Sequence, residues 1–413
     1  MVVGAGASRT ITPEMSATIR FGRVACIILM MFTHVRPYPA FWYMPRFGWW
    51  DYSWHWVYAF FSLYVGKASV PLLGLISGWL LGTQYKAPWW KTAQKKARTI
   101  LLPLFIWNAV LLFIMMSLPW FEPGWPRPAD GWGWFFKFFP LQDYPTNSPL
   151  YFMRDLFLCM LLAPVLLWLF DRFGRRAMVW ILAITIAFAS LPYEGWVWQD
   201  WVPGIGGKPV WLLLTRPVIL PTFVTGLLLA RNGIDIRAPR FFNRWAALAA
   251  AGWLLLELPM LVPVTRMYFV WLPIVGHVPE IITRYALAYL LWWLVAHVAL
   301  RPFGRQVARL EPYIFFIFCT HHIVYLTLAT EFDGHGVRNA IAPVYPLYFF
   351  LQPLIAVSVG LAFYKLMSLL SPTLLGWVTG GRVAGKDKRR IAAEAAAIPE
   401  APIADGGAAL ERS

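Results

Sequence analysis

Long apolar runs recur along most of the chain and are separated by short polar segments. Most runs are about the length that crosses a bilayer core of about 30 Å. Because backbone polar groups in lipid must be paired within their own segment, we predict that these runs are helices. The pattern therefore indicates an all-α, polytopic membrane protein with about ten transmembrane helices. The predicted spans cover residues 21–37, 57–82, 100–118, 150–170, 177–194, 211–230, 246–263, 281–299, 312–329 and 343–369.

Composition agrees with this prediction. The 413 residues are 59% hydrophobic and only 14% charged, whereas soluble chains carry about 25% charged residues. Cys26, Cys159 and Cys319 all fall inside predicted spans, so we expect no disulfide framework. Ligand pairs at zinc-type spacing are missing from the sequence, so no metal site is predicted.

The distribution of basic residues predicts the orientation. When successive loops are assigned to alternate sides, 24 of the 36 Lys and Arg residues fall on the side that holds both termini, and 7 fall on the other. Basic residues concentrate on the cytoplasmic side of membrane proteins, so both termini are predicted to be cytoplasmic. The net charge of +16 then reflects topology and anionic lipid, and we expect no nucleic-acid partner. The predicted parts are a cytoplasmic segment 1–18, a membrane domain 19–372 and a disordered cytoplasmic tail 373–413.

The first predicted span carries two ionisable residues, Arg23 and His34. Their separation of eleven residues is close to three helical turns. Both side chains therefore fall on one face of the helix, roughly 16 Å apart along its axis. Ionisable residues inside a membrane helix are costly and indicate function. The predicted orientation places Arg23 at the cytoplasmic end and His34 toward the outer leaflet.

A basic element precedes the third predicted span. Lys95 and Arg98 are one helical turn apart and share a face, whereas Lys91 and Lys96 are interpreted as positive-inside anchors. Together with Arg23, the first two residues could form a cationic mouth for a phosphorylated ligand. A nucleotide diphosphate that carries a pantetheine arm has about the reach to join this mouth to the histidine.

Five short motifs follow one another along the chain: Arg23 with His34, Val70–Leu81 with Ser77-Gly78, Lys95-x-x-Arg98, Leu150–Phe157 with Arg154-Asp155, and Phe315–His322 with His321-His322. Together they resemble the acyltransferase-3 family of integral-membrane acyltransferases, which move acyl groups onto cell-envelope glycans. The resemblance covers roughly residues 15–370, and members that modify periplasmic glucans and exopolysaccharides are similar. The family usually has arginine where this chain has Lys95, and lysine cannot bind phosphate in a bidentate manner.

The resemblance implies a reaction and a site. His34 is the catalytic residue, a base that accepts the proton of a sugar hydroxyl, which suits a neutral imidazole with a reference pKa of about 6.5. Arg23, Lys95 and Arg98 bind the donor, a cytoplasmic acyl-CoA such as succinyl-CoA or acetyl-CoA, and no cofactor is held. The acceptor is an extracytoplasmic glycan at the bacterial cytoplasmic (inner) membrane. Direct transfer and a covalent acyl-enzyme intermediate both remain open.

A second class of function is a transporter or flippase for a glycan or a lipid-linked sugar. Such a protein also needs many spans and buried charges, but it usually shows repeated halves. This sequence shows no internal repeat. The acyltransferase is therefore the favoured reading.

Other polar residues in predicted spans are candidates for substrate binding: Lys67, Arg154, Glu257, His321 and His322. Lys67 lies near the middle of its span and could pair with Glu257 or with a ligand. Arg154 could bind an anionic group, reach outer headgroups, or pair with Asp155. Adjacent helical residues point about 100° apart, so we expect at most one of the two adjacent histidines to face His34.

Overall fold

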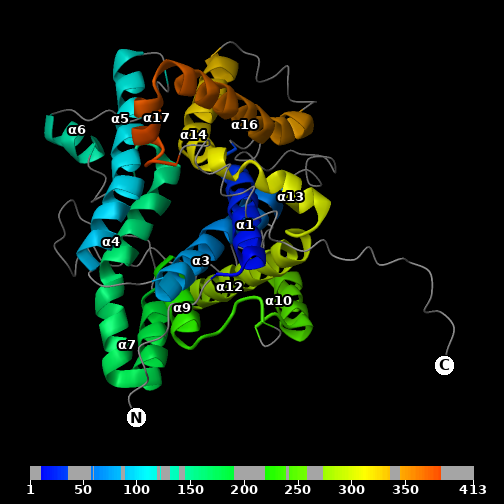
Figure 1. Ribbon diagram of the computed structural model, residues 1–413. Coiled ribbons are helices and arrows are strands. Elements are labelled where there is room, and N and C mark those ends of the chain that lie inside the picture. The colour runs from blue at the N-terminus through cyan, green and yellow to red at the C-terminus, as the bar shows by residue number, and fades with distance from the viewer. Residues whose placement is uncertain are drawn as a thin grey trace.

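The protein is helical throughout the part that the structure describes. The computed structural model describes residues 11–35, 57–58, 60–84, 89–118, 121, 131–138, 145–189, 219–238, 241–257, 273–334 and 345–382. Within these ranges the elements are helices and no strand occurs (Figure 1). The predicted all-α class is therefore confirmed.

The α-helices follow one another in chain order, with short π and 3-10 helices at some of their ends. The α-helices are α1 (Pro13–Met31), α3 (Ser69–Gln84), α4 (Trp89–Lys96), α5 (Leu102–Ser117), α6 (Gly131–Phe138), α7 (Tyr151–Ala189), α9 (Ile219–Arg231), α10 (Arg244–Glu257), α12 (Pro273–Val298), α13 (Pro302–Ala308), α14 (Glu311–Gly334), α16 (Tyr345–Leu370) and α17 (Pro372–Val378). The short helices are the π-helices Phe60–Val65 and Ala97–Leu101 and the 3-10 helices Gly66–Ala68 and Ser148–Leu150.

Among the described residues, six helical stretches are long and apolar enough to cross a membrane. Helix is present in each of the ten predicted ranges. The fourth and fifth ranges both fall on α7, and the backbone of α7 leaves the helical conformation at Gly174 (φ 70°). The number of ten spans and the cytoplasmic termini stay predictions. The six stretches are Phe60–Gln84, Trp89–Ser117, Ser148–Ala187, Glu280–Val298, Glu311–Thr330 and Pro346–Leu370.

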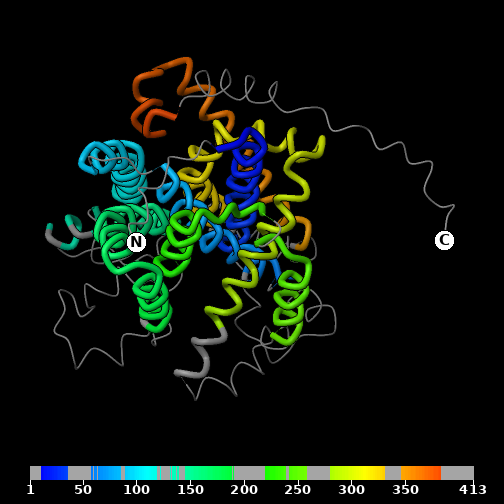
Figure 2. Tube along the Cα trace, turned by 60° about the horizontal axis from the view of Figure 1, so that its bottom comes forward, coloured from blue at the N-terminus to red at the C-terminus, as the bar shows by residue number. Residues whose placement is uncertain are grey.

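Helix α1 lies in the middle of the assembled helices (Figures 1 and 2) and contacts α3, α12, α13 and α14. Its start is fixed locally, because the Thr12 hydroxyl accepts the Met15 N–H at 3.2 Å and Pro13 occupies the first turn. Side chains around the helix, such as Val24 and Cys26, are completely buried. Residues on α1 are therefore placed by packing on several sides.

The backbones of α3 and α9 lie so close together at Gly78 and Gly226 that neither position has room for a side chain. A Cβ atom at Gly78 would lie 2.0 Å from the Phe223 carbonyl oxygen, and one at Gly226 would lie 2.1 Å from the Leu75 carbonyl oxygen. Small residues let membrane helices bring their backbones together in this way. The interface depends on glycine because the opposing atoms belong to the backbone and cannot rotate away.

The second predicted span is not one continuous α-helix. A π-helix (Phe60–Val65) is followed by a 3-10 turn (Gly66–Ala68) before α3 begins. The irregular segment packs against the end of α1: the Ser62 hydroxyl donates to the Phe32 carbonyl at 2.8 Å, and a Cβ atom at Gly66 would meet the Thr33 methyl at 2.5 Å. Irregular helical turns of this kind often mark functional sites.

The packed part of the chain extends beyond the boundary predicted at residue 372. Helix α17 packs on α5, with Leu375 and Val378 buried. The Trp107 indole N–H donates to the Val378 carbonyl at 3.0 Å, and Arg382 donates to the Thr99 carbonyl at 2.9 Å. Residues 373–382 therefore belong to the helical domain, because apolar side chains of α17 find a surface to cover. Residues 383–413 lie outside the described ranges.

Candidate active site

Two parallel helices, α1 and α14, carry charged residues at one end and histidines at the other. At the first end, Arg23 Nη1 lies 3.4 Å from Glu311 Oε1. At the second end, the His34 ring centroid lies 5.5 Å from that of His321 and 5.8 Å from that of His322. Because ten helical residues of α14 separate its charged end from the histidines, the two ends are roughly 15 Å apart.

His34 lies just beyond the end of α1. The helix ends at Met31, and the His34 N–H donates to the Met31 carbonyl at 3.0 Å in the turn that follows. The prediction of a single helix through both ionisable residues is therefore wrong at its outer end. Ser62, bonded to the Phe32 carbonyl, and the close approach of Gly66 hold this turn. As a whole residue, His34 has intermediate solvent exposure.

Both adjacent histidines of α14 lie beside His34, although the sequence predicted at most one. The 100° angle between neighbouring residues leaves both on the half of α14 that faces the turn after α1. The Nδ1 atom of the buried His321 ring lies 2.6 Å from the Phe318 carbonyl oxygen. A carbonyl only accepts, so the Nδ1 atom donates and the Nε2 atom of the neutral ring keeps its lone pair. Among the described residues, that Nε2 atom has no hydrogen-bond partner.

Amide side chains tie α14 to its neighbours next to the histidines. Asn147 Nδ2 donates to the Cys319 carbonyl at 3.0 Å, and the Asn147 N–H donates to Asn108 Oδ1 at 3.2 Å. Tyr325 lies one turn beyond His321, with the two ring centroids 5.6 Å apart. Sequence reasoning missed these three residues. The sequence contained two signals: Asn108 stands inside an apolar run, and Tyr325 stands four residues after His321. The structure buries Asn108 completely.

Basic side chains gather near the charged end of α1. Lys95 lies in the last turn of α4, and Arg98 lies in the π-helix that follows; both are exposed. Lys96, predicted to be only an anchor, lies close enough to Arg23, Lys95 and Arg382 for their positive charges to repel its own. The structure therefore brings the first span and the basic element into one region. We call Arg23, Lys95, Lys96, Arg98 and Arg382 the basic mouth.

Arg382 is the member of the basic mouth that lies outside the basic element and the first span. Its guanidinium lies 4.0 Å from the Phe315 ring centroid and donates to the Thr99 carbonyl. A cation over an aromatic face is stabilised by the ring quadrupole. These contacts connect the end of α17 with α14 and with the π-helix that holds Arg98. No spacing rule relates residue 382 to the first three spans, so only the fold could place it there.

Lys67 and Glu257 lie on neighbouring parts of the fold. Lys67 occupies the 3-10 turn that precedes α3. This turn contacts α1 and α12. Glu257 Oε2 accepts a hydrogen bond from the Tyr64 hydroxyl at 3.4 Å, and Tyr64 precedes Lys67 by three residues. Their roles in binding stay predictions. Within the described residues, no group of three His, Cys, Asp or Glu side chains could hold a metal ion.

Arg154 and Asp155 form a buried ion pair. Arg154 Nε lies 2.7 Å from Asp155 Oδ1, and their side chains are 1% and 4% exposed. Arg154 therefore does not reach the outer headgroups, and the local pair considered from the sequence is present. Arg284 pairs with Glu280 of its own helix, but that pair is partly exposed.

Replacing Arg154 by methionine is expected to lower the free energy of unfolding by about 3–5 kcal/mol, because it leaves the Asp155 carboxylate buried without its partner. Thermal unfolding of the purified protein in detergent measures this change. The double variant Arg154→Met/Asp155→Leu is the control and should recover most of the lost stability. A single variant as stable as the wild type would show that the pair does not stabilise the fold.

Comparison of the chain with known proteins shows what it is similar to. The acyltransferase domain model of the acyltransferase-3 family matches residues 17–365. The succinoglycan biosynthesis protein ExoH of Rhizobium meliloti is 29% identical over 396 residues, which cover 90% of this chain and 94% of that protein. No solved structure matches the chain.

Proposed function

Because the chain belongs to the acyltransferase-3 family and is therefore a membrane acyltransferase, we propose that it transfers an acyl group from acyl-CoA to a hydroxyl of an exported polysaccharide. The likeness to a protein named for succinoglycan biosynthesis supports a polysaccharide acceptor. Succinyl and acetyl are the acyl groups we propose, and the bacterial inner membrane is the proposed location. Under the predicted topology the basic mouth faces the cytoplasm.

The pairing of α1 with α14 is the observation that carries this proposal. Arg23 with Glu311 fixes the charged end, and His34 with His321 and His322 fixes the other. Basic side chains suit the phosphates of the donor nucleotide. The roughly 15 Å between the two ends is about the length that a pantetheine arm spans, given the helical rise. The donor thioester would then lie at the histidines while its phosphates stay in the basic mouth.

His34 acts as the general base in the proposed reaction. Its imidazole takes the proton from the acceptor hydroxyl as the hydroxyl oxygen attacks the thioester carbonyl carbon. A carbon–oxygen bond forms, the carbon–sulfur bond breaks, and CoA leaves as a thiolate that takes up a proton. The Nε2 lone pair of His321, fixed by the bond from Nδ1 to the Phe318 carbonyl, accepts a hydrogen bond that orients His34 or the hydroxyl.

Reversing charge in the basic mouth is expected to weaken donor binding. In the double variant Lys95→Glu/Arg98→Glu, the KM for acyl-CoA should rise about 100-fold or more, because two charge-assisted hydrogen bonds of about 1.5–3 kcal/mol each are lost. Initial rates in proteoliposomes over a range of acyl-CoA concentrations give this value. Lys91→Glu, at another exposed lysine of α4, is the matched control. An equal rise of KM in both variants would contradict specific binding.

The proposed function is tested directly by the acyl content of envelope and exported glycans. Glycans from cells that lack the protein should have lost a specific acyl ester, visible by NMR and mass spectrometry, and the wild-type gene should restore it. Normal acylation with lost glycan export would instead support the transporter. Unchanged acylation and unchanged export would overturn the proposal.

A further inference from the structure

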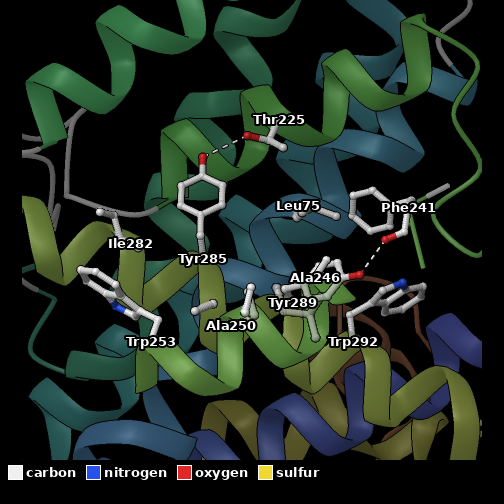
Figure 3. Close-up of a pocket in the computed structure, with 14 residues that line it drawn as sticks. Leu75, Thr225, Phe241, Ala246, Ala250, Trp253, Ile282, Tyr285, Tyr289 and Trp292 are labelled. Carbon is white, nitrogen blue, oxygen red and sulfur yellow. Dashed lines mark hydrogen bonds between the residues drawn. The ribbon is translucent and has the colours of Figure 1, made fainter. Parts of the chain in front are cut away.

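A cavity of about 460 Å³ lies between α3, α9, α10 and α12 (Figure 3). None of the three clustered histidines lines it. One wall is formed by Ala246, Ala249 and Ala250 of α10, and we therefore call it the α10 cavity. Its volume is in the range of sites that bind small molecules, about 300–1,000 Å³. The cavity is thus large enough for a ligand of its own.

The polar side chains on the wall of the α10 cavity are already paired within the protein. Figure 3 shows two of these pairs as dashed lines. The pairs are Tyr285 with Thr225 at 2.9 Å, Trp253 donating to Thr283 at 2.9 Å, Tyr289 donating to the Phe241 carbonyl at 2.7 Å, and Trp292 donating to the Ile236 carbonyl at 2.9 Å. The remaining lining residues are apolar. A ligand here meets hydrocarbon and satisfied polar groups, so the chemistry that fits is that of a hydrocarbon chain.

The α10 cavity lies against membrane-spanning structure. Two of its walls belong to the candidate spans Phe60–Gln84 and Glu280–Val298. Helix α10 exposes large apolar side chains on its outer side, with Leu248 59% and Leu256 77% exposed. A Cβ atom at Gly252 of α10 would meet nothing within 4 Å. Gly252 therefore does not mediate a close helix contact of the kind that Gly78 and Gly226 make between α3 and α9.

The α10 cavity is partly open, and its apolar wall offers few hydrogen bonds to water. Covering this wall with hydrocarbon would remove apolar surface from water. Two of the helices around it belong to candidate membrane spans, so the hydrocarbon available beside it is that of the bilayer. We propose that the α10 cavity binds an acyl chain of a membrane phospholipid. This site is distinct from the histidines and does not depend on the proposed reaction.

Filling the α10 cavity tests the proposal. The full-length protein is purified in detergent, and the phospholipid that remains bound is extracted and quantified by mass spectrometry. Ala250→Trp should lower the retained phospholipid by about tenfold, because the indole occupies the space in which methylene groups were buried. Leu248→Trp, on the outer side of the same helix, should retain as much as the wild type. Equal retention by Ala250→Trp and the wild type would overturn the proposal.

A second measurement needs no variant of the cavity. A phospholipid with a diazirine in the middle of one acyl chain is added to the wild-type protein and photolysed. Peptides of α10 and α12 should carry the label, and prior addition of unlabelled phospholipid should compete it away. Labelling confined to helices that do not line the cavity, or retention of a polyprenyl phosphate in place of phospholipid, would contradict the proposal. If Ala250→Trp fails to fold, phospholipid retention by the smaller variant Ala246→Leu and this labelling experiment test the proposal instead.

Discussion

Replacing His34 by alanine is expected to lower the rate of acyl transfer about 10²–10⁴-fold, the usual contribution of a general base. The fold should survive, because the turn is held by the backbone bond to Met31 and by Ser62 rather than by the imidazole. The measurement is the initial rate with labelled acyl-CoA in proteoliposomes, together with the melting temperature. Loss of activity without loss of stability is the expected pair of results.

His297 offers a matched control for the loss of an imidazole. It lies on α12, where its Nδ1 atom is 2.8 Å from the Trp293 carbonyl oxygen and its ring is tilted against that of Phe242, with 4.9 Å between the centroids. His297→Ala should leave the rate within about twofold of the wild type, since it lies outside the histidine cluster. A His34→Ala enzyme that keeps a third or more of the wild-type rate would exclude His34 as the base.

A substitution can separate the structural role of His321 from its chemical role. An asparagine at this position can still donate to the Phe318 carbonyl, but it lacks the Nε2 lone pair of the imidazole. His321→Asn should therefore keep the stability and lower the rate about tenfold, the effect of one lost hydrogen bond. A wild-type rate in this variant would assign His321 a purely structural role.

Replacing Gly78 by leucine is expected to prevent folding. Even the first carbon of the new side chain would lie 2.0 Å from the Phe223 carbonyl oxygen, so α3 and α9 must separate. The loss should exceed about 4 kcal/mol, the range reached by severe overpacking in a core. Size-exclusion chromatography and thermal unfolding in detergent should show aggregated protein or none.

Gly252→Ala is the control for the glycine itself. This helical glycine of α10 has open space where a Cβ atom would stand. Alanine should leave stability unchanged or raise it by up to about 1 kcal/mol, because glycine is the poorer helix former. A folded, fully stable Gly78→Leu protein would show that the close approach of α3 and α9 is not required.

The sequence by itself determined the helical class and the distances along single helices. Apolar runs long enough to span lipid have no other way to pair their backbone groups, so the all-α class follows from composition and pattern alone. The spacing of Arg23 and Met31 fixes their separation along the first helix, which ends three residues before His34. These properties are local, since they depend on backbone geometry and on neighbouring residues.

Only the tertiary structure decided which residues meet across helices. Arg23 pairs with Glu311, 288 residues away, and both His321 and His322 lie beside His34. Helical periodicity gives the angle between two residues of one helix, but it does not give the rotation or depth of a second helix against it. Those are set by packing across the whole domain, as at the Gly78 contact, and packing also placed Arg382 in the basic mouth.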